Sequence, residues 1–528
     1  MRTPAFRALM RTLAMTRLAE RDALPTPDAI ERLARDATAR PDRRTVLKGL
    51  AAGATVAALP RWADAQSNAQ VAIVGAGLAG LSCADRLRTR GVAATVFEAA
   101  DRVGGRCFSL SGVFPGQVVE RGGELIDNLH KTMIGYAKRF GLTLEDYEKQ
   151  PGEVFYRFDG QPWPEDAVVD EFREFVAAMR RDLRTLSSAP TADASTPGDL
   201  ALDVMTLGEY LVTRRAGPVV AKAIESTYEA EFGLEIEQQS ALNLLLFIHA
   251  DRRSRFTPFG IFSDERYHVV EGNDRIAEGL AADLARPVQH GYVLRRIGRT
   301  AGGRIALTFD TGGPQRTLFY DYAVLSLPFS VLRDLELEDS LDLPAWKRLA
   351  IDELGYGTNA KMMVGFDSPY WRGLGSSGAS YSDLPNHQAT WETAPTRAGA
   401  GGAVLTDYSS GHRGAGLDSG DVQQEAARFL GDLEYVFPGA AAHATTTAGG
   451  YRVHLEHWPS NPLSKGSYTC YKPGQFTTIA GNEGKRIANL LFAGEHTNSF
   501  YDWQGFMEGA CLSGLDAAAT ILNDLKRR

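Results

Sequence analysis

The sequence is poor in the residues that mark several classes of protein. Its 528 residues include only four cysteines, without CxxC spacing, so no disulfide framework is expected and each reads as a buried thiol. The ten histidines are scattered, and His454 and His457 lack a third ligand near them, so no metal centre is predicted. No acid–base triad is evident either. The net charge of −8 argues against a nucleic acid as partner.

Positive charge is in excess only near the N-terminus. Residues 1–65 carry 12 Lys and Arg against 7 Asp and Glu, and with −8 in total the other residues carry −13. Arg43 and Arg44 precede an apolar run over residues 49–59 and a small-x-small cleavage site at 63–65. The run is shorter than the roughly 20 residues that cross a bilayer, so no stable membrane span is expected.

This leader resembles a twin-arginine signal, and an ordinary amphipathic helix is the alternative. The resemblance implies that residues 1–65 lie outside the fold. It also implies that the folded protein passes through the twin-arginine export machinery to the periplasm or the medium. Because that route carries folded proteins, it suits a protein that captures its cofactor before export.

A glycine-rich turn between two apolar segments predicts a dinucleotide site. Residues 71–74 are expected to form a buried parallel strand, and Gly75, Gly77 and Gly80 follow it at GxGxxG spacing. The first glycine permits the tight turn, the second lets the backbone approach a pyrophosphate, and the third lets the helix pack on the strand. Glu98 ends the next predicted strand, where a carboxylate accepts from ribose hydroxyls and disfavours a 2′-phosphate. A purely structural glycine turn is the alternative.

Further segments are typical of enzymes that bind FAD. Residues 100–106 resemble a second dinucleotide signature, in which glycines admit the cofactor and Arg106 meets a phosphate charge. Near the C-terminus, Gly494 and Glu495 follow a predicted strand and resemble a flavin signature whose acid contacts the ribityl or phosphate region. Two residues of the next segment are expected to face the flavin, Phe506 and Met507.

Together these segments resemble the flavin-containing amine oxidase family, which includes monoamine, polyamine and L-amino acid oxidases. The resemblance runs from about residue 70 to residue 522 and includes VERGGE at 119–124 and VVEGN at 269–273. It implies an α/β fold in which a Rossmann-type FAD-binding domain is interleaved with an α+β substrate domain. The implied ranges are 66–150, 265–335 and 455–528 for the first domain, and 151–264 and 336–454 for the second.

The resemblance also implies how the cofactor is held. Gly122 and Gly123 are expected near the flavin. Val288 matches a strand valine whose backbone meets the adenine side of FAD, and a plain core valine is the alternative. Ser467 stands where monoamine oxidases have the cysteine that bonds to the flavin, so FAD is expected to bind without a covalent link, although Cys470 is close in sequence.

Lys361 points most directly to chemistry. It interrupts an apolar strand pattern, where an unpaired buried ammonium is unfavourable. By resemblance it matches the lysine that holds a water beside the flavin, where it assists reaction with dioxygen or places the water that hydrolyses the imine. A strand residue facing solvent is the alternative. Tyr468 and Phe506 match the two tyrosines that wall the channel of monoamine oxidases, and plain core aromatics are the alternative.

Two features bear on the substrate. Asp127 matches a position where polyamine oxidases carry an acid or a histidine, so its carboxylate is placed to hold a second ammonium. The alternative for Asp127 is to cap a helix predicted over 128–140. An amino-acid substrate would instead need an arginine for its carboxylate, and Arg252, Arg253 and Arg255 are candidates that also read as a solvated turn.

The sequence therefore predicts an FAD-dependent amine oxidase. A small-molecule amine would be oxidised to an imine and then a carbonyl, and dioxygen would be reduced to hydrogen peroxide. One alternative is an L-amino acid oxidase. Alternatives of another class are a flavin-dependent desaturase or isomerase, and a flavoprotein without turnover. The oligomeric state is left open, a homodimer included.

Overall fold

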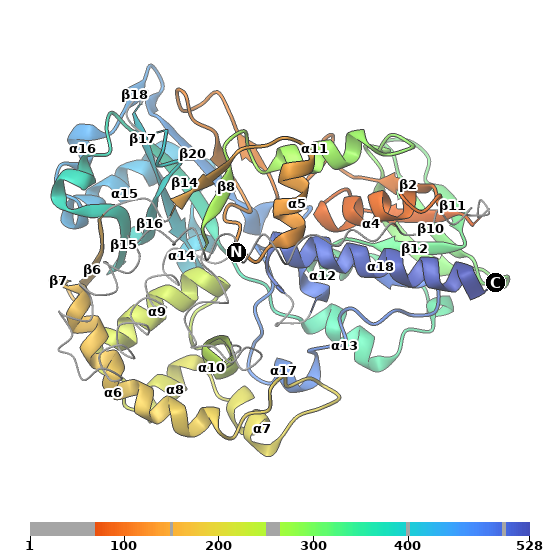
Figure 1. Cartoon of the computed structure of the whole chain (residues 1–528), viewed down its shortest axis with the longest axis horizontal. Helices are drawn as coiled ribbons and strands as arrows, with labels where there is room; N and C mark the ends of the chain where they lie inside the picture. Colours follow the sequence, from red (N-terminus) through yellow and green to blue (C-terminus); the bar gives the residue numbers. More distant parts are fainter. Residues whose placement is uncertain (1–68, 148–151, 250–264, 398–401, 499–502, 528) are drawn as a thin grey trace, which may run out of the picture.

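The computed structural model describes residues 69–147, 152–249, 265–397, 402–498 and 503–527. In Figure 1 a parallel sheet and its helices occupy the right-hand part, while a large sheet and a group of helices occupy the left. Segments of the two parts alternate along the chain. The predicted signal and the three arginines between residues 250 and 264 lie outside the described residues.

The right-hand part is built on a parallel sheet whose strands come from distant segments. In spatial order they are β2 (Ala94–Phe97), β1 (Val71–Val74), β12 (Tyr322–Leu325) and β21 (Leu490–Phe492). β1 and β12 are buried throughout, as expected for central strands covered on both faces. Because the strands are parallel, their carboxyl ends share one edge of the sheet, and the residues that follow those ends meet there.

Helices cover one face of this sheet and a second sheet covers the other. The helices are α4 (Leu78–Arg88), α5 (Lys131–Arg139), α11 (Asp274–Ala282) and α18 (Met507–Arg527). The second sheet consists of β11 (Arg316–Tyr320), β10 (Ile305–Asp310), β9 (Val293–Arg299) and β13 (Glu336–Leu337). Side chains alternate along a strand, so Val71 and Ile73 pack among the helices while Ala72 and Val74 pack toward the second sheet.

The left-hand part is built on a seven-stranded sheet. Its order is β20 (Val453–His457), β14 (Ala360–Phe366), β17 (Ala403–Ser409), β16 (His387–Thr393), β15 (Ser376–Leu384), β6 (Glu153–Phe158) and β7 (Gln161–Trp163). Neighbouring strands are antiparallel except β15 and β6. β14, β16 and β17 are buried at every residue. Helices pack on both faces of this sheet, α15 (Val422–Val436) on one and α9 (Pro218–Phe232) on the other.

Four further helices of this part follow β7 along the chain. They are α6 (Glu165–Leu183), α7 (Pro197–Asp203), α8 (Leu207–Thr213) and α10 (Ala241–His249). α7 and α8 each begin with a capping box, formed by Thr196 with Asp199 and by Thr206 with Glu209. In each box the two side chains satisfy backbone N–H groups that the first helical turn leaves free, which fixes where these short helices start.

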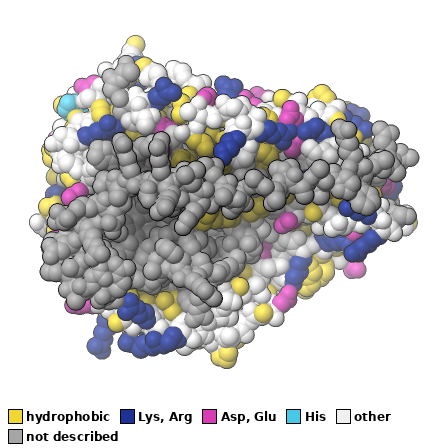
Figure 2. Space-filling view, viewed as in Figure 1, with side chains coloured by type: hydrophobic (Ala, Val, Ile, Leu, Met, Phe, Trp, Pro, Cys, Tyr) yellow, Lys and Arg dark blue, Asp and Glu magenta, His cyan; other side chains and the backbone are white. Residues whose placement is uncertain are grey.

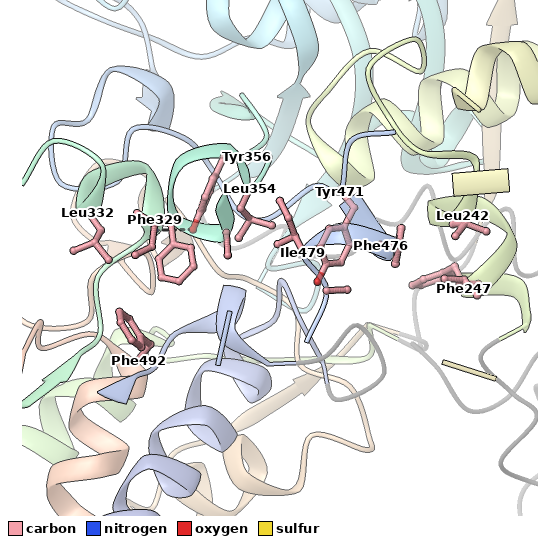
Figure 3. Packing of buried hydrophobic residues seen from close by; sticks show 14 of the residues in the cluster. Leu242, Phe247, Phe329, Leu332, Leu354, Tyr356, Tyr471, Phe476, Ile479 and Phe492 are labelled. Atoms are coloured by element: carbon pink, nitrogen blue, oxygen red, sulfur yellow. Dashed lines mark hydrogen bonds between the residues drawn. The ribbon is translucent and has the colours of Figure 1, made fainter. Parts of the chain in front are cut away.

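One buried cluster joins the two parts. Figure 3 shows it running from Phe492 of β21 and Phe329 of α12 (Phe329–Leu332), through Tyr471 and Phe476, to side chains of α10. The rings of Phe329 and Phe492 meet edge to face with centroids 6.0 Å apart, and those of Tyr471 and Phe476 are 4.3 Å apart. A continuous packed core of this kind fixes the two sheets relative to each other.

The described surface carries charges of both signs. In Figure 2 Lys and Arg side chains gather along the lower edge of the visible face, where α6 and α8 end. Arg180 and Arg181 occupy the last turn of α6, and Arg215 follows α8. Basic side chains at a helix C-terminus complement the negative end of the helix dipole. No helix within the described ranges has the length and apolar character to cross a bilayer.

The domain ranges inferred from the sequence stay a prediction. Near two of their borders, a short strand pairs with the sheet of the other part. β20, at the start of the last predicted cofactor segment, pairs with β14 in the large sheet. β13, at the start of the second predicted substrate segment, pairs with β9 beside the parallel sheet. The chain therefore exchanges short strands between the two parts where it crosses from one to the other.

We expect Gly514→Ala to destabilise the fold, because α18 packs on α4 at this position. A Cβ on Gly514 would lie 2.0 Å from the carbonyl oxygen of Ala79 and 3.1 Å from the amide nitrogen of Cys83. Both are backbone atoms, so relief requires the two helices to separate, with a loss of roughly 1–3 kcal/mol or more. Thermal or urea unfolding of the protein measures the effect.

Gly431→Ala is the matched control. Gly431 is an exposed residue within α15, and nothing lies within 4 Å of the position its Cβ would take. Alanine there is expected to stabilise the protein by about 0.5–1 kcal/mol, because glycine weakens a helix interior. A Gly514→Ala protein as stable as the Gly431→Ala protein would contradict the close helix packing.

Candidate active site

A cavity opens at the carboxyl edge of the parallel sheet and extends to the large sheet. Open α/β sheets bind their ligands at this edge. The predicted site residues that line the cavity are Gly75, Gly77, Glu98, Arg106, Gly122, Gly123, Lys361, Tyr468, Gly494, Glu495, Phe506 and Met507. The three predicted site residues outside this lining are Gly80, Asp127 and Val288.

Two of the three motif glycines are required by the packing of the protein itself. Gly75 has a φ of +104°, which residues with a side chain rarely adopt, and a Cβ there would lie 2.7 Å from the carbonyl oxygen of Ser326. At Gly80 a Cβ would lie 2.0 Å from the carbonyl oxygen of Gly75 and 3.1 Å from Ile73. Only glycine therefore lets α4 approach β1 this closely.

Gly77 is under no such packing constraint and faces the cavity. Its φ is −74°, and a Cβ would meet only the carbonyl oxygen of Gly104, at 3.9 Å. Gly104 and Gly105 have φ values of +99° and +59°, and the amide of Gly104 donates to the carbonyl oxygen of Ala76 at 2.9 Å. The two glycine turns form a cradle of bare backbone at the N-terminus of α4, which suits a pyrophosphate.

Glu98 closes one side of this cradle. Its carboxylate accepts hydrogen bonds from the backbone amides of Ala76 at 2.7 Å and Ala100 at 2.9 Å. The negative charge is thus fixed where β2 ends, next to the turn that follows β1. This is the place from which a carboxylate reaches the ribose of a dinucleotide.

Val288 lies away from the cavity. It is half-buried, and the next residue, Gln289, exchanges backbone hydrogen bonds with Val96 and Glu98 along the edge of β2. The valine that lines the cavity in this region is Val293, the first residue of β9. Val293 is therefore better placed than Val288 for the predicted contact with adenine. The prediction for Val288 rests on family resemblance, and the position of each valine relative to the cavity is set by the fold.

Arg106 and Glu495 form an ion pair beside the cavity. Nη1 of Arg106 lies 2.8 Å from Oε1 of Glu495 and donates to the carbonyl oxygen of Ser467 at 2.6 Å. The hydroxyl of Thr469 donates to the other carboxylate oxygen at 3.0 Å. Burial raises the pKa of Glu495, but the Arg106 charge and these hydrogen bonds outweigh burial and hold the pKa below its ordinary value. The carboxylate is therefore ionised at neutral pH.

Ser467 lines the cavity, whereas Cys470 is buried outside its lining. The hydroxyl of Ser467 donates to Oδ1 of Asn359 at 2.5 Å. The Cys470 thiol lies 3.8 Å from the amide nitrogen of Asn243, and burial raises its pKa far above its ordinary value. A thiol in that state is a poor nucleophile.

Residues 120–124 form the wall where the two sheets approach each other. The side-chain amide of Asn273 donates to the carbonyl oxygen of Gly123 at 2.9 Å and to that of the next residue at 2.7 Å. A Cβ at Gly122 would lie 1.8 Å from the carbonyl oxygen of Arg106. The VERGGE and VVEGN segments are thus interlocked: glycine lets the wall pass over Arg106, and Asn273 holds it there.

Lys361 of β14 is fully buried, and three acceptors hold its ammonium. Nζ donates to the carbonyl oxygens of Glu120 at 3.1 Å and Gly122 at 2.9 Å, and lies 2.6 Å from Oε2 of Glu124. The indole N–H of Trp391 donates to the other oxygen of Glu124 at 3.0 Å. The exposed fractions of the two charged side chains are 0% and 1%. The alternative in which Lys361 faces solvent is therefore excluded.

Two tyrosines stand beside this lysine. Tyr408 of β17 pairs with Lys361 across the strands, and its hydroxyl lies 3.0 Å from the hydroxyl of Tyr468. Tyr468 also donates to the carbonyl oxygen of Ala230 at 3.2 Å. Burial raises the pKa of both tyrosines, so both hydroxyls stay neutral. No sequence signal marks Tyr408 as a site residue, because its place is set by the cross-strand register of β17 with β14.

Phe506 and Asp127 both contact His130. The Phe506 ring lies 5.3 Å from the ring of His130 and 5.5 Å from that of Trp503. The carboxylate of Asp127 lies 3.4 Å from Nε2 of His130 and accepts the backbone amide of Glu265 at 3.3 Å. α5 has His130, not Asp127, as its N-cap, so the capping alternative for Asp127 is wrong.

One group of described carboxylates, away from the cavity lining, is close enough to be considered for a metal ion. Oxygens of Glu229, Glu235 and Glu237 lie within 4.8 Å of one another. Burial, together with a hydrogen bond to Glu235, raises the pKa of Glu229 well above its ordinary value. The raised pKa favours the neutral form of Glu229 beside the Glu235 carboxylate, so the two can lie close together without a cation.

The cavity fits a flavin nucleotide at both ends. One end offers the glycine cradle and the Glu98 carboxylate, and the other offers a buried lysine and two neutral tyrosines, which together define a flavin-dependent oxidoreductase. The family described as flavin containing amine oxidoreductase matches this chain over residues 78–522, and the chain belongs to that family. The protein is an oxidoreductase whose cofactor is a flavin.

Relatives of several activities resemble the chain along most of its length. An L-amino-acid oxidase of Pseudechis australis is 23% identical over 473 residues, which is 86% of each chain. Polyamine oxidase 6 of Oryza sativa subsp. japonica is 23% identical over 492 residues, 89% of this chain and 94% of the relative. Lysine-specific histone demethylase 1 homolog 2 of the same species is 26% identical over 87% of this chain, but the match spans only 58% of that relative.

Solved structures show the same fold. Cyclohexylamine oxidase from Brevibacterium oxydans superposes with a TM-score of 0.73 at 21% identity, over 87% of this chain and all of the other. Putrescine oxidase bound to putrescine gives a TM-score of 0.72 at 18% identity, over 86% and 99% of the two chains. The α/β fold predicted from the sequence is therefore confirmed.

The geometry predicts that alanine at Gly77 weakens flavin binding, whereas alanine at Gly80 lowers the stability of the fold. Gly77→Ala should fold normally, because its Cβ meets no close protein atom, but should bind flavin at least about tenfold more weakly, since the Cβ occupies the approach of the pyrophosphate. Gly80→Ala should lower the melting temperature of the flavin-free protein, because its Cβ collides with the backbone. Unfolding of the flavin-free protein and flavin titration measure the two effects. Unchanged flavin affinity in Gly77→Ala would remove this turn from the site.

Proposed function

We propose that this protein is an FAD-dependent oxidase of small-molecule amines that uses dioxygen as electron acceptor. The observation that carries the proposal is the fixed ammonium of Lys361, 2.6 Å from Glu124 in the wall of a cavity that begins at a dinucleotide turn. The two tyrosines beside it supply an apolar surface with neutral hydroxyls. The resemblance to amine oxidases assigns these residue types to the amine end of the cofactor.

The residues along the cavity support FAD rather than a mononucleotide. The cradle of Gly77 and Gly104 is suited to a pyrophosphate, and Glu98 is suited to the ribose of the adenosine half. We further propose that FAD is bound without a covalent link, since Ser467 replaces the bonding cysteine and the Cys470 thiol is buried outside the cavity.

When bound, FAD supplies the oxidation itself: it accepts a hydride from the carbon next to the amine nitrogen and passes two electrons to dioxygen, which yields an imine and hydrogen peroxide. The chain orients the amine between neutral aromatic side chains, of which Tyr408 and Tyr468 are held by their mutual hydrogen bond. It also excludes water from the reacting carbon, because the aromatic wall is buried. Lys361 holds a positive charge at a fixed point of the same wall.

Acidic side chains near the tyrosines favour a substrate with more than one amine. Burial raises the pKa of Tyr408 most, and the negative charges of Glu231, Glu124 and Glu265 raise it further. Glu124 is paired with Lys361, so we propose that the charges of Glu231 and Glu265 attract a cation, which suits the second ammonium of a diamine or polyamine. Asp127, whose carboxylate accepts the backbone amide of Glu265, belongs to this acidic region and is proposed to act with it.

The L-amino acid oxidase alternative needs an arginine to bind the substrate carboxylate. The two arginines that line the described cavity are Arg102 and Arg106. Arg102 donates to the carbonyl oxygens of Val103 and Gly105, and Arg106 pairs with Glu495, so both are engaged on the nucleotide side. Among the described residues the cavity therefore favours an amine without a carboxylate.

The test of the proposed function is hydrogen peroxide release by the purified flavin-loaded protein, with monoamines, diamines, polyamines and L-amino acids in parallel. We expect peroxide with amines that lack a carboxylate, and the highest kcat/KM with a diamine or polyamine. Peroxide from L-amino acids alone would establish the alternative oxidase. A protein that binds FAD but releases no peroxide with any of these compounds would point to the desaturase, isomerase or carrier alternatives.

We expect Lys361→Met to slow reoxidation of the reduced flavin by dioxygen by about 10²-fold, because a fixed charge near developing negative charge contributes on this scale. Flavin binding should persist, since the cradle residues are unchanged. Stopped-flow mixing of the reduced protein with dioxygen measures the rate directly, and Gly431→Ala serves as a control outside the site. Reoxidation at the wild-type rate would remove Lys361 from this role.

We also propose that the protein is exported through the twin-arginine route to the periplasm or the medium. The support is the order of Arg43 and Arg44, the short apolar run at 49–59 and the cleavage site at 63–65. A cofactor buried between two interleaved parts of the chain suits export in the folded state, because loading requires the completed cavity.

A further inference from the structure

We propose that Glu124 is the positioning residue of Lys361: together with Trp391 it fixes the ammonium in the cavity wall and supplies its counter-charge. The proposal rests on the proposed function only in taking FAD to fill this cavity. It concerns a charge pair built from segments 237 residues apart, which the sequence pattern of either segment does not reveal.

The ammonium of Lys361 has three N–H groups, and the structure provides three acceptors. Two are the backbone carbonyl oxygens of Glu120 and Gly122, at 3.1 and 2.9 Å, and the third is the carboxylate of Glu124 at 2.6 Å. Of the three acceptors only the carboxylate carries charge. Two carbonyl groups alone satisfy hydrogen bonds but leave a buried positive charge without compensation, which is strongly unfavourable.

The two other acidic residues near Lys361 interact with other partners. The side chain of Glu120 accepts from Ser109 and from the backbone amide of Asn273, both at 2.8 Å, and burial raises its pKa well above its ordinary value, which disfavours the charged form. Glu456 pairs with Lys361 across the strands of the sheet, but its carboxylate forms an ion pair with Arg121. Glu124 is therefore the counter-ion of this lysine among the described residues.

Glu124 is itself held at three points. One carboxylate oxygen accepts from the indole of Trp391 at 3.0 Å and the other from Lys361, while its carbonyl oxygen accepts from Asn273 at 2.7 Å. The carboxylate lies between Lys361 of β14 and Trp391 of β16, so it is not free to turn toward a substrate. Its role is to act through Lys361 rather than on the amine.

This arrangement predicts effects of opposite sign on the flavin. Glu124→Gln leaves the lysine charge uncompensated, and a positive charge stabilises the electrons added to the flavin, so the reduction potential should rise. Lys361→Met leaves the carboxylate uncompensated, so the potential should fall. We expect at least a tenfold change in the two-electron equilibrium in each direction, which corresponds to about 30 mV. The double variant should return close to the wild-type potential.

The stabilities of the two single variants and the double variant should show the same compensation. Each single variant leaves one buried charge without its partner and should lower the melting temperature of the flavin-free protein by roughly 5–10 °C, whereas the double variant should recover most of that loss. This measurement needs neither flavin nor amine. Failure of the proposed function, seen as no amine oxidation, is therefore distinguishable from failure of this proposal.

Glu392→Gln is the matched control. Glu392 is the neighbour of Trp391 on β16, is buried, and accepts from the indole of Trp371 at 2.9 Å and from Arg372 at 2.6 Å, but it does not line the cavity. Like Glu124, Glu392 is a buried carboxylate held by a tryptophan indole and a cationic side chain. Its removal should lower stability and leave the flavin potential unchanged.

The experiment is a redox titration of the flavin-loaded wild type, the two single variants, the double variant and the control, with unfolding of each flavin-free protein. Opposite shifts in the single variants with recovery in the double variant support the proposal. Shifts in one direction, no shift, or a double variant less stable than both singles would overturn it. If the single variants do not fold, folding of the double variant supports the proposal and its failure overturns it.

Discussion

The structure depends on burying one lysine between two sheets that come from interleaved segments. Lys361 projects from the large sheet into the wall formed by residues 120–124, which belongs to the parallel-sheet side. A buried ammonium needs a complete set of acceptors and a counter-charge. Both come from the other part of the chain, so the pair also ties the two parts together where the cavity passes between them.

The nucleotide end depends on a different constraint, the close approach of backbone to backbone. Gly80 lets α4 lie against β1, Gly75 makes the turn, and Gly122 lets the wall pass over Arg106. Each position is one where any Cβ would collide with a main-chain atom. Gly77 differs, because the space beside it belongs to the cavity. The same motif thus contains glycines of two kinds, one kind for the fold and one for the ligand.

The two constraints explain why the chain is interleaved. The strands β1, β12 and β21 of the parallel sheet come from three distant segments of the chain. Residues that follow each of these strands line the cavity. β1 precedes the glycine turn, the strand before Gly494 brings Glu495 to Arg106, and the segment between β12 and β21 supplies Lys361 and the two tyrosines. A cavity built in this way is complete only when the whole chain has folded.

Local features could be read from the sequence because their causes are local. The GxGxxG turn, Glu98 after the next strand, and the anomalous charge of Lys361 within an apolar strand all follow from residue type and spacing. The same holds for the segments that resemble the flavin amine oxidase family, to which the chain belongs. Val288 is assigned by resemblance, and the sequence does not tell that Val293, five residues further on, is the valine that lines the cavity.

The sequence by itself determined the glycine turn, the fold class and the lysine on which the proposed function rests. Only the tertiary structure decided the partners of that residue: Glu124 as its counter-ion, Trp391 as the donor that holds Glu124, and Tyr408 opposite it in the sheet. The physical reason is that a charge is stabilised by whatever lies within hydrogen-bond distance in space. Register and sheet packing, rather than separation along the chain, set that distance.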